Sequence, residues 1–211
     1  MDMHIETLVV GPIETNCYIV SDPDTKEAVI IDAGDEAPYI LNYIAQHDLK
    51  VTMLLNTHGH YDHTQANDTI REVTGVPLGI HCDDVDILTV PEKVSSRMMV
   101  KANPCKAPEQ LLHNGDIISF GKYNLQVIYT PGHTKGGCCF YEASEKVCFT
   151  GDTLFKETIG RADLYGGPYP TLLNSVRERL SVLPDDVVIY PGHGEDSTMG
   201  YERKKNPYLK G

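Results

Sequence analysis

Blocks of apolar residues separated by polar turns predict strands over the first third of the chain. Residues 5–10, 16–21 and 51–57 are rich in β-branched and aromatic side chains. Residues 27–34 form a near-continuous apolar run that ends in Asp-Ala-Gly, as expected of a buried strand that feeds a loop. Residues 36–48 instead repeat their apolar side chains at a helical spacing. We therefore expect three strands, a helix and a fourth strand here.

The pattern becomes less regular in the middle of the chain. Residues 64–75 are predicted to form a helix that closes on Gly75, a residue type that often follows the last helical turn. Residues 76–82 indicate a short strand. Residues 83–112 contain three prolines and no clean period, which favours one or two helices and a mobile loop that covers the site.

Paired strands followed by helices recur in the second half. Two hairpins are expected at residues 115–130 and 136–152, and an amphipathic helix is expected within residues 168–184. A last strand within residues 186–196 precedes a short helix or tail at 199–209. Two similar β-rich halves, each followed by helix, suggest a duplication and favour two packed sheets with helices outside.

The composition narrows the classes of protein to which the chain can belong. Its 18 Lys and Arg residues against 30 Asp and Glu residues give a net charge of −12, which disfavours nucleic acid and anionic membranes as partners. No apolar run approaches the ~18 residues of a membrane span, and a signal peptide is not expected. The six cysteines form no CxxC pair, so we expect reduced thiols and a cytoplasmic protein. Because no Gly/Ser-rich linker divides the chain, residues 1–211 are predicted to form a single domain.

Candidate chemistry is concentrated in the segment "NTHGHYDH", residues 56–63, which follows an apolar strand. His58 and His60 are two residues apart, so in an extended segment both imidazoles can face one metal ion. Asp62 and His63 break this alternation, because we expect a helix to begin at about Thr64. A turn at that point would direct them toward a second metal position.

Three later strands also end in metal-binding residue types. His133 follows "YTPG", Asp152 follows "FTG" and His193 follows "YPG", so each lies beside a glycine that lets the backbone turn sharply. Loops held by a rigid sheet are where functional residues concentrate. Imidazole and carboxylate together suit Zn²⁺, Fe²⁺ or Mn²⁺, so the sequence predicts a metal site.

These motifs carry a resemblance to a known family. The segments "THGHYDH", "TPGHTKGG", "FTGDTLF", "IGRAD" and "YPGHGE", in that order, resemble the metallo-β-lactamase fold superfamily, and within it the small glyoxalase II-like (hydroxyacylglutathione hydrolase-like) hydrolases. The resemblance covers nearly the whole chain. It implies an α+β fold, an αββα four-layer sandwich in which helices flank two β-sheets and the metals lie at one edge between the sheets.

The resemblance also implies a ligand set for two Zn²⁺ ions per chain, with Fe or Mn as alternative metals. One ion takes three histidines, the other takes an aspartate and two histidines, and a further aspartate bridges them. In that order, the implied ligands are His58, His60 and His133; Asp62, His63 and His193; and Asp152. Asp32 and Asp163 are expected to support the site from behind the ligands.

The implied reaction is cleavage of a thioester such as S-D-lactoylglutathione by a metal-bound hydroxide, which Asp62 orients or deprotonates. Lys135, Arg161 and Tyr165 are the expected contacts for a small anionic, glutathione-linked thioester; Arg161 has the alternative role of an ion pair with Asp163. The chain stops at Gly211, so we do not expect the helical glutathione-binding extension of larger glyoxalase II enzymes.

Two alternatives differ from this hydrolase in class. A mononuclear iron persulfide dioxygenase would use His58, His133 and Asp152, a set of two histidines and one carboxylate, and such enzymes share the "GRAD" segment. A metal-binding module without turnover is disfavoured, because no ligand of the set is missing. Antibiotic hydrolysis is disfavoured as well, because true metallo-β-lactamases lack an aspartate at the position of Asp152.

Overall fold

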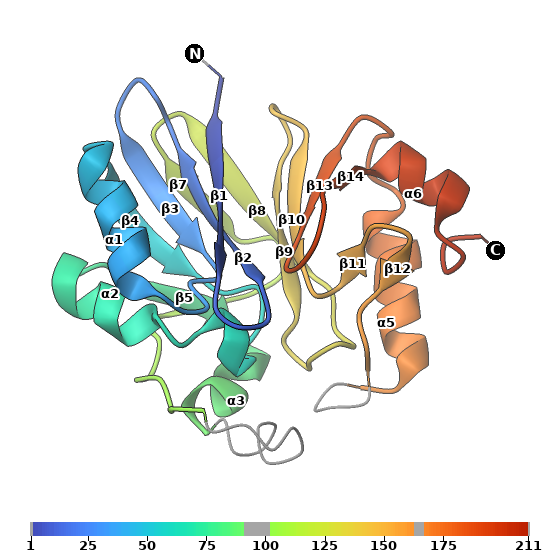
Figure 1. Cartoon of the computed structure of the whole chain (residues 1–211). Coiled ribbons are helices and arrows are strands. Elements are labelled where there is room, and N and C mark those ends of the chain that lie inside the picture. Colours follow the sequence, from blue (N-terminus) through green and yellow to red (C-terminus); the bar gives the residue numbers. More distant parts are fainter. Residues whose placement is uncertain (1, 91–101, 163–166, 211) are drawn as a thin grey trace.

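The computed structural model describes residues 2–90, 102–162 and 167–210. In these ranges two six-stranded sheets lie face to face, and helices cover their outer faces (Figure 1). The first sheet has the strand order β1-β2-β3-β4-β5-β6, and the second has the order β14-β13-β10-β9-β8-β7. Each half of the chain therefore builds one sheet.

The strands are short and most are buried. The first sheet contains β1 (His4–Val10), β2 (Thr15–Ser21), β3 (Glu27–Ile31), β4 (Lys50–Leu55), β5 (Leu78–His81) and β6 (Gln110–Leu112). The second contains β7 (Ile117–Phe120), β8 (Tyr123–Tyr129), β9 (Cys138–Glu142), β10 (Val147–Gly151), β13 (Val188–Pro191) and β14 (Ser197–Thr198). A separate hairpin is formed by β11 (Leu154–Phe155) and β12 (Thr158–Ile159).

The helices lie outside the sheets or in the loops at one edge. They are α1 (Ala37–Gln46), α2 (Asn67–Thr74), α3 (Val85–Thr89), α5 (Tyr169–Ser175) and α6 (Met199–Lys205). Helix α5 continues as a π-helical turn over Val176–Leu180, and two short 3-10 helices cover Tyr61–His63 and Cys82–Asp84.

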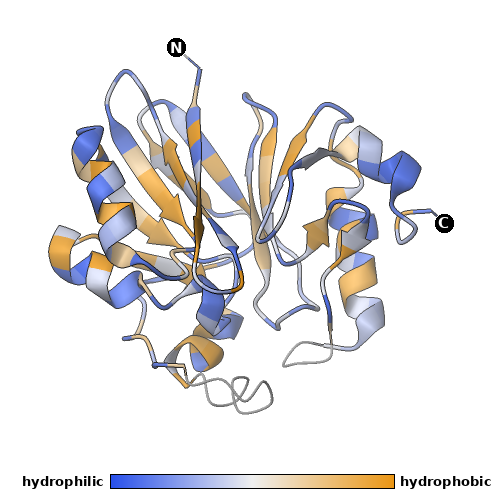
Figure 2. Cartoon of the chain, viewed as in Figure 1, coloured by the Kyte–Doolittle hydropathy of each residue, from blue (hydrophilic) through white to orange (hydrophobic). Residues whose placement is uncertain are grey.

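Strand β2 shows how alternation builds the layers. Successive side chains of a strand point to opposite faces of the sheet. Tyr18 and Val20 belong to the core between the two sheets, whereas Cys17 and Ile19 belong to the core between the first sheet and its helices. A third core, to which Leu172 of α5 belongs, joins the second sheet to its helices. Apolar positions accordingly gather on the strands (Figure 2). Three cores between four layers confirm the expected αββα sandwich.

Most of the predicted elements are confirmed, and the differences have local causes. Strand β6 lies inside residues 83–112, where we expected only helix and loop; it has three residues and pairs in parallel with β5, so it leaves no local pattern. Helix α2 begins at Asn67, not near Thr64, and ends at Gly75 with a φ of 73° as expected. The mobile loop predicted in this region falls largely on residues 91–101, outside the described residues.

Two further findings concern the expected class of protein. Among the described residues, no helix is both long and apolar enough to cross a bilayer. All six cysteines carry free thiols, and five of them are buried. The reduced state predicted from their spacing therefore agrees with the structure.

Candidate metal centre

Loops at the ends of four strands bring the predicted ligands together. His58 and His60 follow β4, and Asp62 and His63 lie in the 3-10 helix that comes next. His133 follows β8, Asp152 follows β10 and His193 follows β13. The two sheets thus contribute to one cluster. The 3-10 helix, not a longer helix at Thr64, makes the turn that separates the second pair of ligands from the first.

The first group consists of His58, His60 and His133. One ligand nitrogen of each lies within 4.8 Å of the others, and all three side chains are buried. The ring centroids of His58 and His60 are 4.7 Å apart, and those of His60 and His133 are 4.6 Å apart. This spacing can hold one metal ion among three imidazoles.

The second group consists of Asp62, His63 and His193. Nε2 of His63 and Nε2 of His193 both lie 3.3 Å from Oδ2 of Asp62. The carboxylate of Asp152 lies between the two groups: its Oδ1 is 3.4 Å from Nε2 of His63, and its Oδ2 is 3.4 Å from Nε2 of His133. One carboxylate therefore offers an oxygen to each group.

Hydrogen bonds on the far side of the rings direct the lone pairs inward. Nδ1 of His133 lies 2.8 Å from the carbonyl oxygen of Arg161, and Nδ1 of His193 lies 3.1 Å from that of Ile13. Carbonyl oxygens only accept hydrogen bonds, so Nδ1 carries the proton in both contacts. In the neutral ring the lone pair is then on Nε2, which faces the centre of the cluster.

A similar relay lies behind His58 and His63. The hydroxyl of Thr57 donates to Oδ2 of Asp32 (2.7 Å) and lies 3.0 Å from Nδ1 of His58. The Thr57 hydroxyl donates its single proton to Asp32, so its oxygen accepts a hydrogen bond from Nδ1 of His58. Nδ1 of His63 lies 3.0 Å from the same Oδ2. Asp32 was expected to support the ligands from behind, and its carboxylate accepts hydrogen bonds from Thr57 and from the ligand His63. Thr57 was missed, because a threonine after a strand gives no signal in the sequence.

The cluster contains buried polar atoms that the protein does not satisfy. Nε2 of His58, Nε2 of His63 and Oδ1 of Asp152 have no hydrogen-bond partner among the described residues. On His60 the atom that faces the other imidazoles is Nδ1, which lies 2.9 Å from Nε2 of His133. Buried polar groups are nearly always hydrogen-bonded, and exceptions call for an ion or a ligand. Lone pairs of imidazoles and carboxylates that face one another fit a divalent cation, so the residues present fit the implied metals.

The electrostatic environment favours neutral imidazoles on His58 and His60 and an ionised carboxylate on Asp152, the protonation states that a metal requires. Burial and neighbouring histidines hold the pKa of His58 well below its usual value, and burial lowers that of His60 to about 3. Burial alone would raise the pKa of Asp152, but the charge of His63 outweighs it and lowers this pKa to about 2. Burial disfavours charge on His63 as well, yet Asp62 and Asp152 raise its pKa well above the usual value. Without a metal, a proton on His63 offsets the carboxylates.

Glycines let the ligand loops approach one another. A Cβ on Gly192 would lie 2.2 Å from Oδ1 of Asp152 and 2.8 Å from Cε1 of His63. A Cβ on Gly160 would lie 1.8 Å from the carbonyl oxygen of Asp152. Such distances exclude a side chain, so the glycines beside the ligands are required by packing as well as by the turns.

Replacing Gly192 by alanine should therefore displace Asp152 and His63. We expect metal affinity to fall about 10- to 100-fold, as for loss of a group that orients a ligand, and stability to fall by about 1–3 kcal/mol from overpacking. Competition with a chelator and thermal denaturation measure the two effects. Gly167→Ala is the matched control, because its nearest neighbour is 3.6 Å away. Equal metal affinity in both variants would contradict this packing argument.

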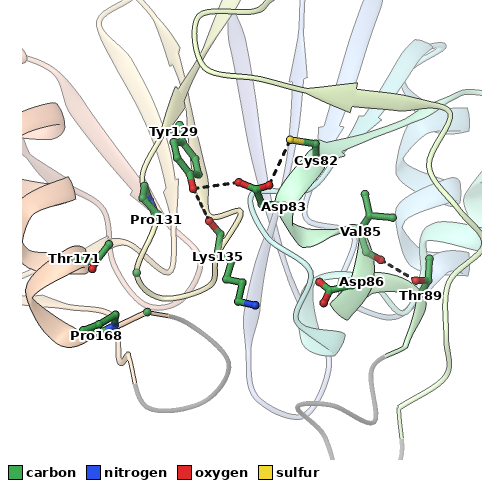
Figure 3. Close-up of a pocket in the computed structure, with 12 residues that line it drawn as sticks. Cys82, Asp83, Val85, Asp86, Thr89, Tyr129, Pro131, Lys135, Pro168 and Thr171 are labelled. Carbon is green, nitrogen blue, oxygen red and sulfur yellow. Dashed lines mark hydrogen bonds between the residues drawn. The ribbon is translucent and has the colours of Figure 1, made fainter.

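Lys135, one of the predicted substrate contacts, lines a cavity of about 770 Å³ (Figure 3). The cavity lies between the loop after β8, helix α3 and the start of α5. Its walls include Tyr129 and Asp83, whose side chains are hydrogen-bonded (3.2 Å). Gly132, which precedes His133 in the sequence, also lines this cavity.

A second cavity, of about 360 Å³, reaches the second ligand group. Asp62 and Tyr61 line it, together with Ile13 from the loop between β1 and β2. Tyr61, the neighbour of Asp62 in sequence, therefore forms part of the wall of this cavity.

The other predicted contacts are placed differently. Arg161 supports the site through its backbone carbonyl, which accepts from His133, while the residue itself is exposed. Asp163 and Tyr165 lie outside the described residues, and so does the expected ion pair between Arg161 and Asp163. Among other basic residues, Lys156 pairs with Glu195, and Lys204 and Lys205 lie at the exposed end of α6.

Comparison with known proteins places the chain in a family. A family model described as "Metallo-beta-lactamase superfamily" matches residues 10–193. A curated relative, hydroxyacylglutathione hydrolase GloC of Haemophilus influenzae, is 36% identical over 98% of this chain and 98% of its own.

Solved structures share the architecture over nearly the whole chain. BLEG-1, a B3 metallo-beta-lactamase, is 34% identical with a TM-score of 0.93 and covers 99% of this chain and 100% of its own. TTHA1623 in a di-iron-bound form is 31% identical with a TM-score of 0.87, covering 97% and 100%. ETHE1 from Myxococcus xanthus is 28% identical with a TM-score of 0.79, covering 97% and 83%.

Proposed function

The chain belongs to the metallo-beta-lactamase superfamily, and from this premise we propose that it is a dinuclear metal hydrolase of the glyoxalase II type. Its substrate is a small thioester, with S-D-lactoylglutathione as the representative compound. The observation that carries the proposal is the carboxylate of Asp152, which offers one oxygen to each of two ligand groups. We propose zinc as the metal; the di-iron-bound relative makes iron the alternative.

The chemistry divides between the ions and the protein. When bound, two divalent ions supply an activated water at neutral pH and stabilise negative charge on the carbonyl oxygen of the substrate. Asp62, only 12% exposed, lines the cavity that reaches the ligands, so its carboxylate can orient that water and accept its proton. The protein needs no serine or cysteine nucleophile.

We propose that the thiol carrier occupies the cavity beside Lys135 and that the acyl group lies toward Asp62. An anionic carrier such as glutathione requires local positive charge in a chain of net charge −12. The Lys135 side chain extends into its cavity in Figure 3. Its ammonium group can pair there with a carboxylate of the carrier.

Replacing Lys135 by alanine should raise KM for S-D-lactoylglutathione about two- to five-fold with kcat unchanged, because an exposed ion pair contributes little more than this. The difference should shrink at high salt, which screens the charge. Lys135→Arg should retain the wild-type KM. The matched control Lys156→Ala removes a lysine that pairs with Glu195 and should leave KM unchanged. An unaltered KM in Lys135→Ala would remove this residue from the carrier site.

A persulfide dioxygenase is the second candidate, favoured by the similarity to ETHE1. It would use His58, His133 and Asp152 around one iron. Oδ2 of Asp152 lies 3.4 Å from Nε2 of His133, so this smaller set is also present in the cluster.

The two candidates are separated by parallel assays on one purified preparation. Loss of the thioester absorbance of S-D-lactoylglutathione reports hydrolysis, and an oxygen electrode reports consumption with glutathione persulfide. A third assay, with a chromogenic β-lactam, tests for β-lactamase activity, because the chain is similar to the B3 metallo-beta-lactamase BLEG-1. We expect thioester hydrolysis to exceed the other two activities. Oxygen consumption without thioester hydrolysis would overturn the proposal.

A further inference from the structure

We propose that Asp84 is a positioning residue that clamps the two loops carrying the first metal-ligand group. Asp84 is fully buried in the short 3-10 helix after β5. Its Oδ2 accepts from the backbone N–H of Gly59 (2.9 Å) and from the hydroxyl of Thr134 (2.7 Å), and its Oδ1 accepts from the N–H of Gly136 (2.5 Å). One carboxylate thus joins two loops that are 75 residues apart in sequence at Gly59 and Thr134.

The anchored positions are the immediate neighbours of ligands. Gly59 lies between His58 and His60, and Thr134 follows His133. The first loop leaves β4 of the first sheet and the second leaves β8 of the second sheet. Three imidazoles that share one ion must keep a fixed spacing, and here they come from different sheets. Asp84 is a direct link between the two loops that carry them.

The packing shows that both loops are built to approach this carboxylate. A Cβ on Gly59 would lie 2.6 Å from the Ile87 side chain and 3.0 Å from the carbonyl oxygen of Asp84. A Cβ on Gly136 would lie 2.5 Å from the backbone nitrogen of Asp84 and 2.8 Å from its Oδ1. Each loop therefore has a glycine where it packs against the Asp84 segment. This close packing is a second observation, separate from the hydrogen bonds to the Asp84 carboxylate.

Only a carboxylate satisfies the three donors. Asparagine has the same shape, but its amide nitrogen donates and cannot accept from a backbone N–H or a hydroxyl. In Asp84→Asn at least one buried donor therefore loses its acceptor, and one of the two loops is released from the clamp. The three hydrophobic cores contain neither Asp84 nor its hydrogen-bond partners. We therefore expect the substitution to disturb the positions of the metal ligands before it disturbs the fold.

The test is metal affinity, measured in the full-length chain after removal of metal with a chelator. We expect Asp84→Asn to bind Zn²⁺ about 10- to 100-fold more weakly than wild type in competition with a chromophoric chelator, the usual effect of losing a group that orients ligands. At saturating Co²⁺ the visible spectrum of the variant should differ from that of wild type, because the ligand geometry has changed. Asp48→Asn, which changes an exposed aspartate in the turn after α1, is the matched control and should resemble wild type in both measurements.

Thr134 provides an independent pair of variants for the case in which Asp84→Asn does not fold. Thr134→Val removes the hydroxyl at nearly constant volume and should weaken Zn²⁺ binding in the same direction, whereas Thr134→Ser should restore it. Wild-type Zn²⁺ affinity and Co²⁺ spectrum in Asp84→Asn, or unchanged affinity in Thr134→Val, would overturn the inference.

The inference rests on the metal centre of the proposed function but on no particular substrate. Its failure and that of the proposed function are distinguishable. If wild type binds Zn²⁺ and the variants match it, the clamp is wrong; if wild type binds no divalent ion, the metal centre itself is wrong.

Discussion

His58→Ala is expected to lower the rate of thioester hydrolysis by about 1,000-fold or more. The imidazole belongs to the first ligand group, and its buried Nε2 has no hydrogen-bond partner among the described residues. Metal ions lower a barrier by several kcal/mol, and each 1.36 kcal/mol corresponds to a factor of ten. Steady-state kinetics at saturating added Zn²⁺ measure the loss.

The fold should survive this substitution, because the ligand loops lie at the edge of the sheets and the three cores contain none of the ligands. Circular dichroism tests that expectation. His113→Ala is the matched control: this histidine is exposed, at 62% of its side chain, and its loss should leave activity unchanged. Full activity in His58→Ala would show that the site has been assigned to the wrong residues.

Asp32→Ala is expected to have the largest effect on stability. Its buried carboxylate accepts from the backbone N–H of Thr57 (2.8 Å), from the hydroxyl of Thr57 and from His63. Removing the acceptor leaves these buried donors unsatisfied, which costs about 3–5 kcal/mol in the free energy of unfolding. Metal affinity should fall about 10- to 100-fold as well, because Asp32 orients His63 and, through Thr57, His58.

A second aspartate supplies the control for backbone strain. Asp32 has a φ of 57° and Asp48 has a φ of 53°, but Asp48 is exposed. Alanine at a left-handed position costs about 1–2 kcal/mol at either site, so the difference between Asp32→Ala and Asp48→Ala isolates the hydrogen bonds. Urea denaturation of both variants measures it. Equal destabilisation would mean that the carboxylate of Asp32 contributes nothing beyond its backbone conformation.

The ligand cluster could be predicted from sequence because each of the loops that carry its residues follows a recognisable strand. His133, Asp152 and His193 follow apolar runs, and the structure gathers them with the histidines after β4. Strand ends are local features, and a sheet brings the ends of its strands to common edges. The four-layer arrangement was predictable for a related reason, since alternation in strands such as β2 assigns side chains to two faces.

Apart from Asp32, the residues that support the ligands could not be predicted in the same way. Asp84 contacts Thr134 across 50 residues, and buried Asn16 donates to the carbonyl oxygens of Pro191 and Gly194 on either side of His193. Nothing in the neighbouring sequence distinguishes such residues from a surface aspartate or asparagine. Their roles follow from long-range contacts, which only the three-dimensional structure supplies. Strand β6 was not predicted for the same reason: its three residues are defined as a strand by their parallel pairing with β5.

The proposed substrate contacts are the hardest part of the site to predict from sequence, because charge alone does not place a side chain. Lys135 lines a cavity together with Gly132, the residue before His133, and Lys156 forms an ion pair with Glu195. Arg161 contacts the cluster through its backbone, a role that its side-chain chemistry does not indicate.

The most direct test of the central claim is the metal content of the purified protein, determined by elemental analysis together with activity. The account predicts two divalent ions per chain, zinc in the active form, and thioester hydrolysis that is lost on chelation and regained when Zn²⁺ is added back. One iron ion per chain, with oxygen consumption in the presence of glutathione persulfide and no thioester hydrolysis, would contradict it.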